Sequence, residues 1–155
     1  MSKVRVYVDT SVFGGTQDEE FVQFSRHFFD RVKQGDFTVL VSPQLLAELE
    51  LAPNKVRQVL ENLSPETIEE VPVNSEVEAL ADAYIAAGVL GEGSKADAIH
   101  VAAATVAGAD LILSWNFSRL VRYDRIRMFN GVNILRGYHA VDIRSPMEVA
   151  HEEED

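Results

Sequence analysis

The chain contains no cysteine, which excludes disulfide bonds, thiolate nucleophiles and zinc sites built on cysteine. It has no apolar run approaching the roughly 18 residues of a membrane-spanning helix and opens with no signal peptide. We therefore expect a cytoplasmic protein with no membrane partner. No stretch rich in glycine, proline or serine divides its 155 residues. One domain over residues 1–148 is expected, followed by a disordered acidic tail at 149–155.

Positive charge is also scarce, because 14 lysines and arginines stand against 25 aspartates and glutamates, giving a net charge of −11. Proteins that bind nucleic acid without specificity usually carry a basic face, so a simple phosphate-binding module is disfavoured. The acidic excess suits a cation-binding site, and it equally suits solubility. The acidic tail is either a solvated end or a competitor for a basic surface.

The hydrophobic pattern alternates between two kinds of segment. Short runs rich in valine, isoleucine and leucine predict strands, and apolar residues at helical spacing predict helices. The predicted strands cover residues 4–8, 37–41, 67–73, 109–114 and 132–135. The predicted helices cover residues 18–34, a segment that begins at 42–43 and restarts at 53–54, and residues 75–87, 94–108 and 117–121. Strands alternating with helices predict an α/β fold, a three-layer α/β/α sandwich with a parallel central sheet.

Asp9 is the most informative single residue. It follows the first predicted strand directly, where α/β folds place their chemistry. Asp9, Thr10 and Ser11 would each cap a helix, but three capping residues in a row exceed what one helix needs. We therefore interpret Asp9 as a functional carboxylate.

Three further side chains are expected at the same edge of the sheet. Glu48 interrupts a row of leucines that face the core, whereas Glu50 points elsewhere, about 200° around the helix. Asp97 begins a helix that is otherwise almost entirely small or apolar, so the acid needs a partner or a metal. Asn116 follows the fourth strand. Together with Asp9 these side chains make an oxygen-only pocket for Mg²⁺ or Mn²⁺, which predicts phosphodiester hydrolysis.

Other polar residues near these positions have simpler interpretations. Asp110 begins the fourth strand and should lie at the opposite edge of the sheet. His100 is more often a packed, hydrogen-bonded histidine than a metal ligand. Trp115 is more often a packing residue than a platform for a nucleic-acid base.

The segments that carry these residues resemble the PIN-domain family, metal-dependent nucleases that include the VapC toxins. Four motifs occur in the family's order and spacing between Val4 and about Asn133. They are Val8-Asp9-Thr10-Ser11, Ser42-Pro43-Gln44-Leu45-Leu46-Ala47-Glu48, Lys95-Ala96-Asp97-Ala98-Ile99-His100-Val101-Ala102 and Leu113-Ser114-Trp115-Asn116-Phe117. The resemblance assigns the family's three acids to Asp9, Glu48 and Asp97. It implies a Mg²⁺ or Mn²⁺ cofactor, an RNA substrate, a homodimer and a protein antitoxin.

Asn116 departs from the family, because many members have an aspartate at this position. The site therefore has one negative charge fewer. Two functions remain open: a metal-dependent ribonuclease acting as the toxin of a toxin–antitoxin pair, or a catalytically weak PIN-like module that binds RNA or a protein partner.

Several neighbours of these acids are candidates for supporting roles. Thr10, Ser11 and Ser114 are candidates to orient the ligands or contact the substrate. Arg119 and Arg122 are spaced to share a helical face, and either position phosphates or offset the acidic surface.

Overall fold

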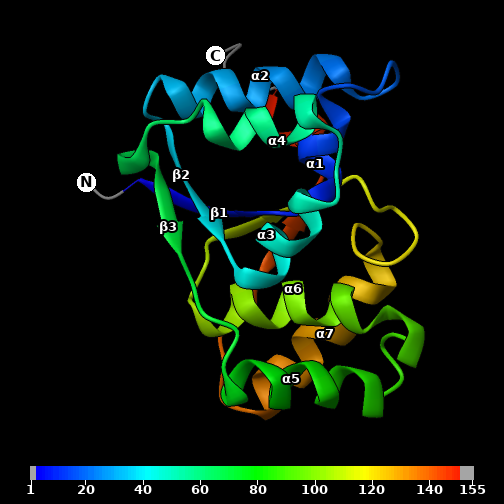
Figure 1. Cartoon of the computed structure of the whole chain (residues 1–155). Helices are drawn as coiled ribbons and strands as arrows, with labels where there is room; N and C mark the ends of the chain where they lie inside the picture. Colours follow the sequence, from blue (N-terminus) through cyan, green and yellow to red (C-terminus); the bar gives the residue numbers. More distant parts are fainter. Residues whose placement is uncertain (1–2, 151–155) are drawn as a thin grey trace.

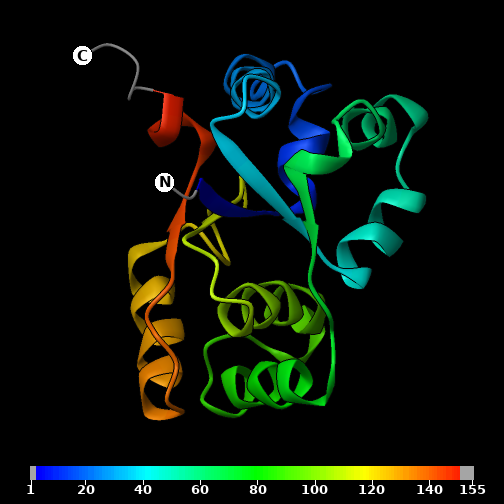
Figure 2. The same ribbon diagram turned by 90° about the vertical axis from the view of Figure 1, so that its left-hand side faces the viewer.

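Five parallel strands form a single sheet at the centre of the computed structural model, which describes residues 3–150. The sheet order is β3-β2-β1-β4-β5. The strands are β1 (Val4–Val8), β2 (Phe37–Val41), β3 (Ile68–Glu70), β4 (Leu111–Leu113) and β5 (Asp142–Arg144). Helices lie on both sides of this sheet (Figures 1 and 2). The predicted three-layer α/β/α sandwich with a parallel central sheet is confirmed.

The helices divide into two layers, one on each face of the sheet. One layer contains α1 (Thr10–Gly15), α2 (Val22–Lys33), α3 (Pro43–Glu50), α4 (Asn54–Glu61) and α8 (Pro146–Ala150). The other contains α5 (Ser75–Ala86), α6 (Lys95–Val106) and α7 (Tyr123–Leu135). Two short 3₁₀ helices, η1 (Pro65–Thr67) and η2 (Glu92–Ser94), precede β3 and α6.

Alternate side chains of the central strands bind the two layers to the sheet. In β1, Tyr7 packs in the core with α5, α6 and α7, whereas Val6 and Val8 pack in the core with α1 to α4. In β2, Leu40 packs in the core with α5, α6 and α7, and Val39 packs in the core with α1 to α4. All five side chains are fully buried. Parallel strands covered on both faces read as continuous apolar runs, which is why the sequence identified β1 and β2 correctly.

The three central strands end at the same edge of the sheet. Tyr7 pairs with Leu40 of β2, and Val8 pairs with Leu113 of β4. The residue that follows each strand is polar: Asp9, Ser42 and Ser114. The backbone N–H of Asp9 donates to the carbonyl of Leu113 at 2.9 Å, so the backbone of Asp9 is still held by the sheet. The fold therefore gathers polar side chains at the carboxyl ends of the strands, as the sequence predicted.

The last third of the chain differs from the sequence-based expectation. The predicted helix 117–121 is a series of turns, and the predicted strand 132–135 is the last turn of α7. There the buried Asn133 accepts a hydrogen bond from Tyr84 of α5 at 2.5 Å, a contact that requires the helix. The fifth strand is β5, which was not predicted. Its residues alternate between exposed and buried, but the strand is only three residues long, too short for the alternation to distinguish it from a loop.

The predicted boundary at residue 148 also shifts. Val149 is buried in α8, and its carbonyl accepts a hydrogen bond from Arg31 of α2 at 3.2 Å. Val149 and Ala150 therefore belong to the folded part rather than to a tail, because the hydrophobic contact with α2 continues past residue 148. Residues 151–155 of the predicted tail lie outside the described residues. No helix within residues 3–150 combines the length and hydrophobicity needed to span a membrane.

Gly15, the last residue of α1, lies where two side chains leave no room for a Cβ atom. A Cβ there would lie 2.4 Å from Ser25 Oγ and 2.8 Å from Trp115 Nε1. These two groups are joined by a hydrogen bond of 2.8 Å, with the indole donating. The neighbouring Gly14 has nothing within 4 Å of the equivalent position.

We expect Gly15→Ala to lower the free energy of unfolding by about 1–3 kcal/mol, because the added methyl group must displace the Ser25 and Trp115 side chains. Gly14→Ala is the matched control and should leave stability equal or raise it by up to ~1 kcal/mol, since alanine favours a helix. Urea denaturation of both variants measures the difference. Equal free energies for the two variants would show that α1 can move away from Trp115 without cost.

Candidate active site

Asp9 is held at the carboxyl end of β1 by two serines. It occupies the residue before α1, but its side chain makes no hydrogen bond that caps the helix. Instead its Oδ2 accepts hydrogen bonds from Ser11 Oγ and Ser114 Oγ, each at 2.8 Å. The residue is only 6 % exposed. A buried carboxylate that accepts from two hydroxyl groups and caps no backbone N–H of α1 favours the functional interpretation of Asp9 over the capping one.

The two serines also connect α1 to the chain that leaves β4. Ser11 Oγ accepts from the backbone N–H of Trp115 at 2.9 Å, and Ser114 Oγ accepts from that of Asn116 at 2.9 Å. Each hydroxyl therefore receives one fixed donor and points its own hydrogen at Asp9. Ser11 and Ser114 orient the Asp9 carboxylate, which fits the supporting role predicted for them.

Glu48 approaches the same place from α3. His100 Nε2 lies 3.0 Å from both of its carboxylate oxygens, Gln44 Nε2 donates to Oε2 at 2.8 Å, and Thr10 Oγ1 donates to Oε1. Partial burial disfavours the charged carboxylate, but the hydrogen bond and charge of His100, with the hydrogen bonds from Thr10 and Gln44, outweigh it. Together they lower the pKa of Glu48 from 4.5 to about 2. Glu48 is therefore ionised at every physiological pH.

His100 joins Glu48 to a buried chain of hydroxyl groups. Its Nδ1 lies 2.6 Å from the Tyr7 hydroxyl, which in turn lies 2.6 Å from Ser42 Oγ. Burial alone would lower the pKa of His100, but the hydrogen bond to Glu48 and the charges of Asp9, Glu48 and Asp97 raise it above 6.5. Burial raises the pKa of Tyr7, so its hydroxyl keeps its hydrogen. The sequence-based interpretation of His100 as a packed, hydrogen-bonded residue is confirmed.

Asp97 reaches the site from the first turn of α6. Its Oδ2 lies 3.4 Å from Arg119 Nη1, and its side chain is 18 % exposed. Burial raises the pKa of Asp97, the negative charge of Asp9 raises it further, and the charges of His100 and Arg119 oppose both effects. Because the net effect raises the pKa of Asp97, the folded protein keeps this carboxylate ionised at a cost in free energy. Burial causes the larger part of that cost, and the charge of Asp9 adds to it.

Asp9, Glu48 and Asp97 therefore all lie near enough to His100 for their charges to raise its pKa. The distance from His100 Nε2 is 3.0 Å to Glu48 and 3.9 Å to Asp9 Oδ1. Even so, no group of three or more His, Asp or Glu side chains within residues 3–150 is arranged to hold a metal ion as it stands. Both oxygens of Glu48 are already used by protein donors.

The donor set nevertheless fits a hard divalent cation. In the described part of the chain, no hydrogen bond is made to Oδ1 of Asp9 or to Oδ1 of Asp97. Mg²⁺ commonly binds through one or two carboxylates and keeps several waters. Asp9 and Asp97 would supply those two carboxylates, and Glu48 would add a third charge held in place by His100.

Solved structures share this arrangement of helices and strands. A chain of the VapBC2 complex from Rickettsia felis, bound to a promoter DNA fragment, aligns with a TM-score of 0.59 and 11 % identity over 92 % of this chain and 98 % of its own. VapC20 of Mycobacterium tuberculosis, described as a toxin that cleaves the sarcin–ricin loop, aligns with a TM-score of 0.54 and 17 % identity over 69 % and 86 %. A chain of FitAcB from Neisseria gonorrhoeae aligns with a TM-score of 0.57 and 16 % identity over 92 % and 98 %.

The chain has the PIN-domain fold. The PIN resemblance predicted from four short motifs is confirmed at the level of the fold. No family model matches the sequence, and no curated protein does either. Identities of 11–17 % establish the fold alone, so the chemistry of the site depends on this chain's own residues.

Asn116 lies at this edge of the PIN fold, but its side chain faces its own turn. Its Oδ1 accepts hydrogen bonds from Ser118 Oγ and from the backbone N–H of Arg119, each at 3.0 Å. These two donors use both lone pairs of the amide oxygen. Asn116 therefore shapes the turn that carries Arg119, and the structure gives no support for it as a metal ligand.

The two candidate arginines separate, because residues 117–121 do not form a helix. Arg119 pairs with Asp97, whereas Arg122 Nε pairs with Asp124 Oδ1 at 2.9 Å at the start of α7. The expectation that they share one helical face is wrong. Arg119, 53 % exposed beside Asp97, remains the better candidate to contact a phosphate.

Two other interpretations from the sequence are confirmed. Trp115 is buried, stacks on Phe21 with ring centroids 4.2 Å apart, and thus packs the core of the PIN fold. Asp110 accepts a hydrogen bond from the backbone N–H of Arg5 at 2.8 Å, at the amino end of β1 and the opposite edge of the sheet.

The sequence analysis missed Tyr7 and Ser42, which support the site through His100. The available signal was the alternation of β1, since Tyr7 is the only residue with a polar tip among the buried positions of that strand. Alternation places Tyr7 on the face that α6 covers, the helix that carries His100.

Proposed function

We propose that this chain is a metal-dependent ribonuclease that hydrolyses RNA phosphodiester bonds, as the toxin of a toxin–antitoxin pair. One observation carries the proposal: the half-buried Asp97 lies close enough to the buried Asp9 for burial and the charge of Asp9 to raise the pKa of Asp97. Within residues 3–150 each of the two acids also keeps one oxygen that accepts no protein hydrogen bond. Two like charges held together at a cost suit a site that binds a cation.

The residues take separate roles in this proposal. Asp9 and Asp97 would hold Mg²⁺ or Mn²⁺, and the ion when bound supplies an activated water and neutralises charge on the phosphoryl group. Ser11 and Ser114 fix the Asp9 carboxylate in one orientation. His100 keeps Glu48 ionised and directed at the same place. Arg119 is exposed beside Asp97, where a guanidinium can contact a phosphate.

The partners in the proposal come from proteins with the same fold. VapBC2 and FitAB are complexes that were solved with DNA, and VapC20 is described as a toxin that cleaves the sarcin–ricin loop. By analogy we extend to this chain a protein antitoxin, a homodimeric assembly and a cytoplasmic location. The closely held acids of the site give the analogy its physical basis.

The decisive experiment is a cleavage assay with metal-free protein and a mixed pool of single-stranded RNA. We expect no cleavage in EDTA and cleavage after Mn²⁺ or Mg²⁺ is added, with a DNA pool of the same sequences cut more slowly or not at all. RNA binding without cleavage at any metal concentration would contradict the nuclease proposal.

That contrary result would identify a catalytically weak PIN-like module that binds RNA or a protein partner. Two observations favour this alternative. The amide oxygen of Asn116 already accepts two hydrogen bonds from its own turn, and both carboxylate oxygens of Glu48 already accept hydrogen bonds from protein donors. Cleavage that requires metal would exclude it.

A further inference from the structure

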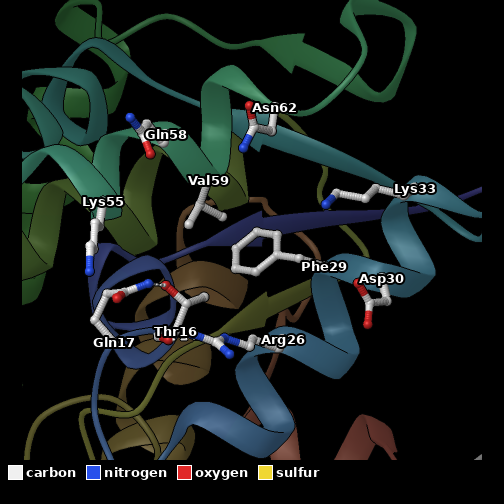
Figure 3. A pocket seen from close by; sticks show the side chains of 10 residues that line it. All are labelled: Thr16, Gln17, Arg26, Phe29, Asp30, Lys33, Lys55, Gln58, Val59 and Asn62. Carbon is white, nitrogen blue, oxygen red and sulfur yellow. Dashed lines mark hydrogen bonds between the residues drawn. The ribbon is translucent and has the colours of Figure 1, made fainter.

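A cleft of about 490 Å³ lies between α2 and α4, at the end of α1. Phe29 of α2 and Val59 of α4 line it centrally, and Lys33 and Lys55 lie on opposite sides of them (Figure 3). Arg26 of α2 lines the same cleft. The cleft therefore combines an apolar floor with cations on several sides.

The cations of the cleft are available to a ligand. Lys33 and Lys55 are exposed and make no hydrogen bond or ion pair within the described residues. Arg26 donates only its Nε, to the carbonyl of Thr16 at 3.2 Å, which leaves its terminal amino groups for another partner. Asp30 is the one acid in the lining. This local excess of positive charge stands out in a protein with a net charge of −11.

The cleft and the acidic site lie at the two ends of α1. The helix begins directly after Asp9, and Thr16 and Gln17, which follow its last residue, line the cleft. Six helical residues span about 9 Å. On α2, Arg26 and Lys33 are two turns apart, or about 10 Å along the helix axis. Arg26 and Lys33 thus follow one another along α2, and the cleft begins one short helix away from Asp9.

We propose that this α2–α4 cleft binds the phosphate backbone of single-stranded RNA on one side of the bond that is cut. The inference rests on the proposed ribonuclease function and adds a second contact region for the same substrate. Lysine and arginine hold phosphates, and these contacts set the position of a strand without reading its sequence. The amides of Gln17, Gln58 and Asn62 lie between the cations and offer donors and acceptors to bases and sugars. The side chains of a carboxylate-rich peptide only accept hydrogen bonds, so they would leave the acceptor oxygens of these amides without partners.

The test measures RNA binding rather than cleavage. Wild-type protein and the double variant Lys33→Gln/Lys55→Gln are titrated into a labelled 20-nucleotide single-stranded RNA in EDTA, at several salt concentrations. We expect the double variant to bind roughly tenfold more weakly. The slope of log affinity against log salt should fall by about 1.4, because each lysine–phosphate contact with a single strand contributes about 0.7.

The matched control is Arg127→Gln/Arg136→Gln, which removes the same charge from α7 and the residue that follows it. This control should bind the RNA like the wild type. Equal affinity and slope for Lys33→Gln/Lys55→Gln and the wild type would overturn the inference. So would equally tight binding of a polyglutamate peptide of matching length, because the cleft would then be a general anion site.

A second measurement separates this inference from the proposed function. With metal present, the lysine double variant should show a raised KM for the 20-nucleotide RNA and an unchanged KM for a dinucleotide, whose single phosphodiester occupies the active site and leaves none for the cleft. If no form of the protein cleaves RNA, the nuclease proposal fails, while the binding titration still decides whether the cleft holds the strand.

Discussion

Replacing Asp97 with asparagine is expected to abolish RNA cleavage and to stabilise the metal-free protein. Burial and the charge of Asp9 raise the pKa of Asp97 above 3.8, so the ionised side chain destabilises the fold at neutral pH. Asparagine removes that charge and still offers an oxygen to Arg119. We expect Tm in EDTA to rise by about 2–4 °C, which corresponds to ~1 kcal/mol in a chain of this size. Metal-dependent cleavage should fall by roughly a thousandfold.

The stabilisation has a defined pH range. Because the pKa of Asp97 is raised in the folded protein, its destabilising effect is present above pH 3.8 and disappears as the side chain is protonated. Glu61→Gln at the exposed end of α4, a carboxylate with no hydrogen bond or ion pair within residues 3–150, is the control and should change neither Tm nor cleavage. An Asp97→Asn protein with a lower Tm in EDTA than the wild type would assign Asp97 a structural role instead.

Replacing His100 with glutamine is expected to flatten the dependence of stability on pH. Folding lowers the pKa of Glu48 from 4.5 to about 2, so this carboxylate stabilises the fold above pH 4.5 and loses its effect as the pH falls toward 2. Folding raises the pKa of His100 above 6.5, so the imidazolium stabilises the fold below pH 6.5 and loses its effect as the pH rises. The pair contributes fully between pH 4.5 and 6.5.

His100→Gln keeps one donor for Glu48 but removes the positive charge. We expect a loss of about 2 kcal/mol in unfolding free energy at pH 5.5, and a smaller loss at pH 9, when urea denaturation is measured across this range. Cleavage at neutral pH should stay within roughly tenfold of the wild type, since Glu48 remains ionised. His139→Gln, which changes an exposed histidine, is the control. A His100→Gln profile parallel to that of the wild type would show that the pair is not coupled to folding.

The sequence alone predicted four of the five strands and named the residues of the candidate site. The runs that form β1 and β2 are apolar because both faces of a parallel sheet are covered, and this pattern is local enough to read from the chain. Asp9 was identified because it directly follows such a run. Glu48 and Asp97 were identified because a charged residue in an otherwise apolar helical pattern needs an explanation.

The sequence could not predict the elements whose state depends on distant contacts. Residues 132–135 have a strand-like composition, yet they continue α7 because Asn133 bonds to Tyr84 and packs against α5. β5 is a strand because it pairs with the edge of β4, and its alternation of exposed and buried residues covers only three positions, too few to predict a strand.

Tertiary structure alone decided how the acids of the site are held. The motif order indicated that Asp9, Glu48 and Asp97 meet, because parallel strands end at a common edge. It did not indicate that Glu48 bonds to His100, or that the oxygen of Asn116 turns toward its own backbone. Side-chain direction depends on the donors that other elements bring within about 3 Å, and a linear pattern does not contain those distances. The sequence named the residues of the candidate site, and the packing of α1, α3 and α6 around the sheet determined which hydrogen-bond partners each of them has there.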